Sequence, residues 1–94
     1  MPQIQVTIPH SLRSLCDGKS ANPLCINART VREVLAELGR QHPQVHVRLC
    51  DEQGDPRQHI NIFVNDDHIR ARAGLDTSLT TGDLVTILPA VSGG

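Results

Sequence analysis

The feature that most limits the fold is a single apolar stripe with helical spacing. Val31, Val34, Leu35 and Leu38 recur at intervals of three and four residues. This spacing places them along one side of an α-helix. Because a helix with one apolar face must be covered by another layer, the rest of the chain has to supply that layer.

The helix carries its own start and stop signals. Thr30 and Glu33 have capping-box spacing: the Thr30 hydroxyl accepts from the N–H of residue 33, and the Glu33 carboxylate accepts from the N–H of Thr30. Gly39 and then Pro43 are expected to end the helix. A further short helical turn is expected over residues 44–50, packing Val45 and Leu49 inward.

Three segments alternate apolar and polar residues, as strands with one buried face do. They cover residues 3–8, 59–65 and 84–88, with these residues expected inward: Ile4, Val6, Ile8, Ile60, Ile62, Val64, Val85 and Ile87. A strand over residues 24–28 should pair antiparallel with the first. After turn residues 65–67, a short return strand is expected over residues 68–71, and Pro89 should close the last strand.

The order strand, strand, helix, strand, short strand, strand predicts an α+β domain in which one main helix covers one mixed sheet. We expect the first and last strands to be neighbours at the centre, which defines a β-grasp fold. The predicted domain spans residues 1–89, and residues 90–94 form a flexible tail.

Composition limits the function classes. The 94 residues include 9 Lys+Arg, 10 Asp+Glu, one Phe and no Tyr or Trp. Neither the basic surface nor the aromatic platform of a nucleic-acid binder is expected. One domain of this size leaves little room for a deep active site, which favours a carrier or binding module over an enzyme, so no catalytic residue is assigned. The start of the sequence has no signal-peptide or membrane-span pattern, and a cytoplasmic location is expected.

The histidines and cysteines do not predict a metal site or a bound cofactor. His42 and His46 are four residues apart, but the intervening proline disrupts a shared helix face. His59 and His68 could face each other across a hairpin, although no motif supplies carboxylate or thiolate partners.

The three cysteines, Cys16, Cys25 and Cys50, are too widely spaced for a disulfide framework or a CxxC motif. Free thiols are therefore expected. We expect Cys25, in its strand, to be a small core or edge residue.

The last residues carry a family resemblance. The segment from Asp83 to Gly94 reads DLVTILPAVSGG. It resembles the ThiS/MoaD family of ubiquitin-like sulfur carriers, and the likeness extends over essentially the whole chain. Residues 61–66 and 86–91 are most similar to the members that serve cysteine biosynthesis. Ser92 stands where these relatives usually have alanine, another small residue.

The resemblance implies that the working group is the carboxylate of Gly94. An E1-like adenylyltransferase/sulfurtransferase would activate it with ATP and magnesium and convert it to a thiocarboxylate. The further partners implied are a PLP-dependent cysteine synthase and a JAMM-type metalloprotease. Gly93 and Gly94 lack a Cβ, so they suit passage through a narrow channel.

Because ordering a flexible tail on binding costs entropy, the affinity for a partner must come from a docking surface on the folded body. Phe63, Leu84 and Leu88 have the outward phase of their strands, and Val91 follows in the tail. We expect these residues to form the partner-docking patch, although single exposed apolar residues are common on proteins.

Several functions share these features. The sulfur could go to molybdopterin, thiamine or another metabolite instead of cysteine. The same activated terminus could form an isopeptide bond to a lysine, making the chain a ubiquitin-like modifier. A plain interaction domain with inert glycines is a third reading.

Overall fold

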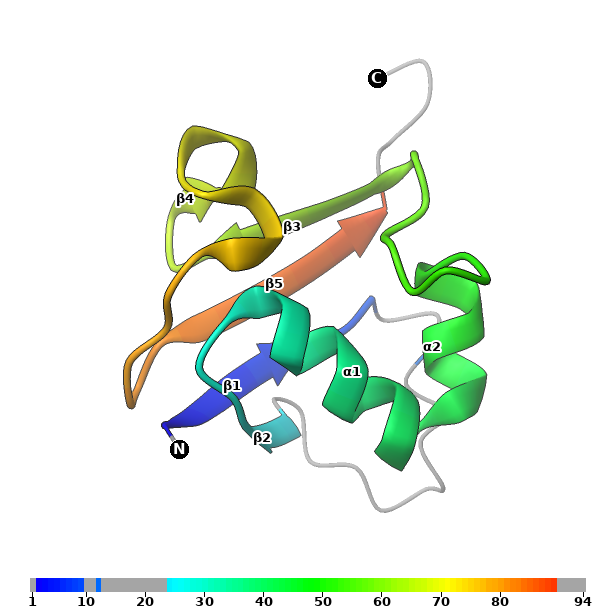
Figure 1. The fold of residues 1–94 in the computed structure, drawn as a ribbon, viewed down its shortest axis with the longest axis horizontal. Helices are drawn as coiled ribbons and strands as arrows, with labels where there is room; N and C mark the ends of the chain where they lie inside the picture. Colours follow the sequence, from blue (N-terminus) through cyan, green and yellow to red (C-terminus); the bar gives the residue numbers. More distant parts are fainter. Residues whose placement is uncertain (1, 10–11, 13–23, 90–94) are drawn as a thin grey trace.

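The computed structural model describes residues 2–9, 12 and 24–89. The sheet has five strands in the order β2-β1-β5-β3-β4 (Figure 1). The strands are β1 Gln3–Thr7, β2 Leu24–Asn27, β3 Ile60–Val64, β4 Asp67–His68 and β5 Leu84–Pro89. The helices are α1 Val31–Gln41 and α2 Pro43–Leu49, with 3-10 turns η2 Ile69–Ala71 and η3 Gly74–Asp76.

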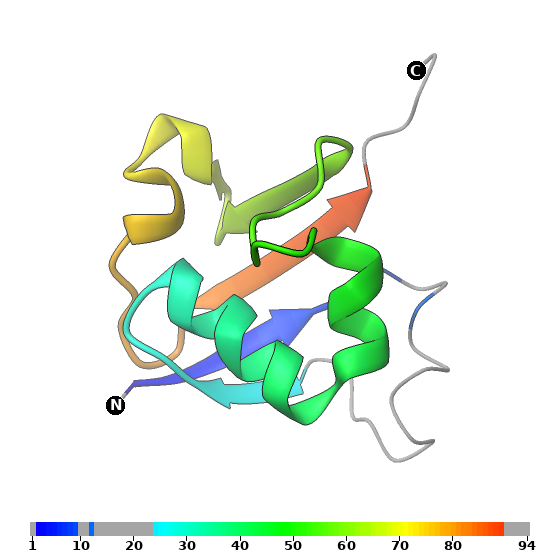
Figure 2. The ribbon, with the colours of Figure 1, turned by 45° about the vertical axis from the view of Figure 1, so that its right-hand side comes forward.

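As predicted, the first and last strands are neighbours at the centre of the sheet. β1 and β5 run parallel, with Val6 opposite Val85, and β2 pairs antiparallel with β1 on one side. On the other side, β3 pairs antiparallel with β5, with Ile62 opposite Ile87. Figures 1 and 2 show α1 crossing one face of this sheet. The β-grasp prediction is therefore confirmed.

The residues that the alternation placed inward all lie in the core. Their side chains are at most 8% exposed, and the apolar stripe of α1 packs against them. Val45 and Leu49 of α2 are also buried, as predicted. β5 extends one residue beyond the predicted strand, because Pro89 still lies opposite Ile60. A proline at the end of a strand leaves the earlier ladder intact.

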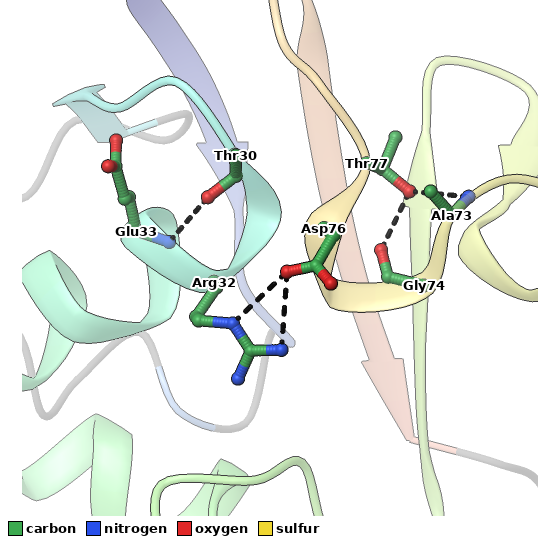
Figure 3. Close-up of polar contacts among 7 residues, drawn as sticks. All are labelled: Thr30, Arg32, Glu33, Ala73, Gly74, Asp76 and Thr77. Carbon is green, nitrogen blue, oxygen red and sulfur yellow. Dashed lines mark hydrogen bonds and ion pairs between the residues drawn. The ribbon is translucent and has the colours of Figure 1, made fainter.

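The start of α1 differs from the predicted capping box in one bond. The Thr30 hydroxyl accepts from the N–H of Glu33 at 3.2 Å, as expected (Figure 3). The Glu33 carboxylate, however, accepts from the N–H of Arg29 at 2.7 Å instead of that of Thr30. Thr30 has an extended backbone, so the N–H of the preceding residue is the one within reach of this side chain.

The prediction that Gly39 helps end the helix is wrong. α1 continues through Gly39 to Gln41, and His42 caps it by donating its N–H to the Leu38 carbonyl at 2.7 Å. A Cβ on Gly39 would lie 3.0 Å from the His46 ring, so this glycine allows α2 to pack closely. The break comes at Pro43, which cannot donate and occupies the first turn of α2.

The return strand expected over residues 68–71 is also shorter than predicted. β4 stops at His68, and η2 follows. The Nδ1 atom of His68 accepts from the N–H of Arg70 at 3.0 Å, which caps the 3-10 turn and diverts the backbone from the sheet. Ile69 is thereby buried in the core.

The segment after η2 is joined to the start of α1 (Figure 3). The buried Thr77 hydroxyl donates to the Gly74 carbonyl at 2.7 Å and accepts from the N–H of Ala73 at 3.1 Å. The Arg32 guanidinium donates to the Asp76 carboxylate at 3.3 Å, linking α1 to η3. These contacts fix the chain that leads into β5.

Candidate functional site: the outer face of the sheet

The face of the sheet opposite the helices carries the predicted docking residues. Leu84, Thr86 and Leu88 of β5 alternate with the buried Val85 and Ile87. Phe63 lies directly opposite Thr86. Leu84 and Leu88 are therefore its two diagonal neighbours, at a spacing of roughly 7–8 Å that aromatic side chains can reach. The fold brings Phe63, Leu84 and Leu88 onto one surface.

These three side chains differ in exposure. Leu88 is 43% exposed, and only one other large apolar residue of the described chain, Val47 at 56%, is classed as exposed. Phe63 and Leu84 are partly exposed. The surface is therefore a small apolar patch with Leu88 as its most accessible member, next to the end of β5.

A polar framework holds Phe63 from the β4 side. The ring of His68 meets that of Phe63 edge-on, with centroids 5.1 Å apart. The Nδ1 atom of His68 accepts from a backbone N–H, so Nε2 carries the proton and donates to the Asn61 side-chain oxygen at 3.1 Å. His68 thus faces Phe63 and not His59, which the hairpin alternative placed opposite it.

A second framework fixes the start of β5. The Asn65 side chain donates to the Asp83 carboxylate at 3.2 Å and accepts from the N–H of Leu84 at 3.1 Å. Asn65 has a positive φ of 55°, a conformation that asparagine tolerates. The hydrogen bond from the Thr80 N–H, reinforced by that from Asn65, lowers the pKa of Asp83. This framework sets which β5 residues face outward.

Sequence reasoning missed both frameworks. Asn61 and His68 share the outward phase of neighbouring strands, which could have indicated a contact. Asn65 was recognised only as a turn residue. Its contact with Asp83 joins positions 18 residues apart, and a local pattern carries no signal for such a contact.

Val91, Gly93 and Gly94 lie outside the described residues, as does Cys16. The predicted boundary between domain and tail therefore stays a prediction, and so do the roles of these residues.

The described thiols differ in environment. Cys25 is exposed on β2, which is an edge strand, so its prediction as an edge residue holds. Cys50 is buried, and desolvation raises its pKa to about 11. Within the described ranges, no three His, Cys, Asp or Glu side chains come together as a possible metal site. The same part of the chain has no helix long and apolar enough to span a membrane.

The chain is similar to known proteins over nearly its whole length. A family model described as the ThiS family matches residues 7–94. The sulfur carrier protein CysO of Mycobacterium tuberculosis is 36% identical over 93 residues, covering 97% of this chain and 98% of the relative.

Two solved structures show the same fold over nearly the whole length. The small archaeal modifier protein 1 of Methanosarcina acetivorans has a TM-score of 0.80 at 31% identity, covering 100% of this chain and 98% of that protein. A chain of the BexX/CysO complex of Amycolatopsis orientalis has a TM-score of 0.77 at 33% identity, covering 97% of this chain and 99% of that chain.

Proposed function

The chain belongs to the ThiS family, and from that premise we propose that it is a sulfur carrier whose working group is the carboxylate of Gly94. The observation that carries the proposal is the extent of the likeness. The family match continues through residue 94, and CysO is covered over 98% of its length. The proposed role needs no catalytic side chain in this protein, because partner enzymes supply the chemistry.

A carboxylate must be activated before sulfur can replace one of its oxygens. A carboxylate oxygen of Gly94 would attack the α-phosphorus of ATP, and pyrophosphate would leave. Sulfide would then attack the carbonyl carbon of the acyl adenylate, and AMP would leave with the oxygen. If a persulfide attacks instead, it forms an acyl disulfide, and a thiol must cleave the S–S bond to release the thiocarboxylate and a disulfide. The product is a thiocarboxylate, which can transfer its sulfur without releasing free sulfide. An E1-like adenylyltransferase/sulfurtransferase using ATP and magnesium is the proposed partner.

The proposed destination of the sulfur is cysteine, because CysO is among the relatives. The thiocarboxylate sulfur would bond to the β-carbon of an activated, serine-derived acceptor held by a PLP-dependent cysteine synthase, and the activated oxygen substituent would leave that carbon. A JAMM-type metalloprotease would then hydrolyse the bond between the new cysteine and Gly94. The carrier would thereby return with its carboxylate free.

We further propose that Phe63, Leu84 and Leu88 dock the activating partner, with Val91 extending the contact. Their placement on one surface supports this role, with Leu88 near the end of β5 that leads toward Gly94. The contact of His68 with Phe63 limits the ring's freedom, so little side-chain entropy would be lost on docking.

The test is exchange between ATP and labelled pyrophosphate, which requires reversible adenylation of the carrier. With the cognate activating enzyme, exchange should depend on this protein and be lost when Gly94 is deleted. The Ser92→Ala variant should retain exchange, because relatives usually have alanine there. Unchanged exchange after deletion of Gly94 would contradict the proposal.

A second candidate is a ubiquitin-like protein modifier, favoured by the likeness to small archaeal modifier protein 1. In that role a lysine amine would attack the activated Gly94 and displace its leaving group. Blotting for this protein in its own cells should then reveal larger adducts. Peptide mapping should find lysine joined to Gly94. Thiocarboxylate without such adducts would favour the carrier.

A further inference from the structure

A surface hollow on the helix side of the sheet has no role in the proposed chemistry. It measures about 330 Å³ and lies between β3, the loop that precedes it, and turns η2 and η3. Figures 1 and 2 show this loop and the two turns flanking β3 on the same side as the helices. The residues that line the hollow include four aliphatic ones and two arginines: Ile60, Ile62, Ile69, Leu75, Arg57 and Arg70.

The floor of the hollow is aliphatic. Ile60 and Ile62 of β3 contribute their inward faces, while Ile69 and Leu75 come from the two 3-10 turns. The three isoleucines are no more than 8% exposed, and Leu75 packs partly buried against the core. A volume near 300 Å³ is at the lower limit of small-ligand sites, so the space suits one or two side chains of a bound segment.

The charged groups that line the hollow are cationic. The Arg57 guanidinium donates through Nε and Nη2 to the Val47 carbonyl at 3.3 and 3.0 Å. These bonds hold the guanidinium against α2, and Arg57 also lines a neighbouring hollow together with Asp51 and Glu52. Arg70 is the second arginine of the lining. In the described ranges no carboxylate lines the hollow, and no ion pair includes Arg57 or Arg70.

From these features we propose that the hollow binds a partner-protein segment in which an aliphatic side chain is flanked by acidic residues. The aliphatic side chain fills the space above Ile60 and Ile62, and the carboxylates pair with Arg57 and Arg70. Phe63 faces the opposite side of β3, so this segment and the partner on the outer face can bind together. The inference goes beyond the proposed sulfur chemistry and does not depend on Gly94.

The test is an amide NMR titration of the full chain with short capped peptides. The probe has leucine between two glutamates, and the controls have leucine between two lysines or alanine between two glutamates. We expect the probe to shift the amide signals of Gln58, Ile69, Gly74 and Leu75. Both controls should bind more weakly, because one lacks the charge and the other lacks the aliphatic group.

Variants separate the charge contribution from non-specific attraction. Arg57→Gln and Arg70→Gln should each weaken binding about threefold to fivefold, as expected for partly exposed ion pairs. Arg29→Gln, at the start of α1 and away from the hollow, should leave binding unchanged. The retained spectrum outside the hollow would show that each variant is folded.

Three results would overturn the proposal. One is the absence of shifts up to the solubility limit of the probe. Another is binding without the expected specificity, seen either as equal binding by the lysine peptide or as shifts located on the outer face around Phe63. The third is equal binding by hexanoate, which would assign the hollow to small carboxylates instead of a protein segment. None of these results depends on adenylation of Gly94.

Discussion

Ile87 and Leu88 are neighbours in β5, yet their surroundings are opposite. Ile87 is fully buried between the sheet and its helices, whereas Leu88 is 43% exposed on the outer face. Both are aliphatic and of similar size, so the pleat of the strand alone decides which one contributes to the core. The comparison teaches that one strand can stabilise the fold through one face and present an apolar contact surface on the other.

The largest expected effect is on the inner face. Ile87→Ala should lower the free energy of unfolding by about 2–5 kcal/mol, because it removes buried methyl groups and leaves a cavity. Urea denaturation followed by circular dichroism measures this change. Leu88→Ala is the control and should change stability by about 1 kcal/mol or less. Equal losses in the two variants would break the comparison.

The two described thiols extend the comparison to chemical reactivity. Cys25 is exposed, whereas burial raises the pKa of Cys50 to about 11. At neutral pH this lowers the thiolate fraction of Cys50 on the order of a hundredfold below that of an ordinary thiol. Timed alkylation with iodoacetamide and peptide mapping should find Cys25 modified well before Cys50. Faster reaction at Cys50 would contradict the described packing.

The outer face should affect docking more than stability. Leu88→Ser is expected to change the unfolding free energy by about 0.5 kcal/mol or less. It should reduce carrier-dependent pyrophosphate exchange about fivefold or more, as for a side chain central to an interface. Val47→Ser is the matched control, since Val47 is exposed on α2 and lies away from this face. A similar loss of exchange in both variants would argue against the docking patch.

The smallest expected effect is on stability at low pH. It concerns the turn before β5, whose hydrogen bonds determine which β5 side chains face outward. Hydrogen bonds from Thr80 and Asn65 lower the pKa of Asp83 in the folded state. A carboxylate with a lowered folded pKa adds stability above its unfolded pKa of about 3.9, and this stability is lost as pH falls through the folded value. Between about pH 6 and pH 3, Asp83→Asn should therefore lose less stability than the original chain. Parallel urea titrations at both pH values measure the difference, and identical losses would contradict the assignment.

The local sequence pattern was sufficient to predict the three main strands and their buried residues. Alternation identified β1, β3 and β5 because period-two burial leaves a direct trace in the sequence. Spacing likewise identified the buried stripe of α1. The prediction at Gly39 was wrong because tertiary packing against His46 outweighs the weak helix propensity of glycine.

The side-chain hydrogen bonds of the outer face could not be predicted from the local sequence pattern. The histidine cap on Arg70 turned an expected strand into a 3-10 turn, and it depends on side-chain geometry. The bond between Asn65 and Asp83 depends on strand pairing that only the fold provides. Strand alternation correctly predicted that Phe63, Leu84 and Leu88 share the outer face, whereas their docking role stays a prediction.

The central claim is that Gly94 is the group that carries sulfur, and intact-protein mass spectrometry tests it most directly. The protein would be incubated with its activating enzyme, ATP, magnesium and a sulfur donor, and then fragmented. The account predicts replacement of one oxygen by one sulfur, located at Gly94. An active enzyme that yields neither adenylate nor thiocarboxylate on this chain would contradict it and leave an interaction domain as the better description.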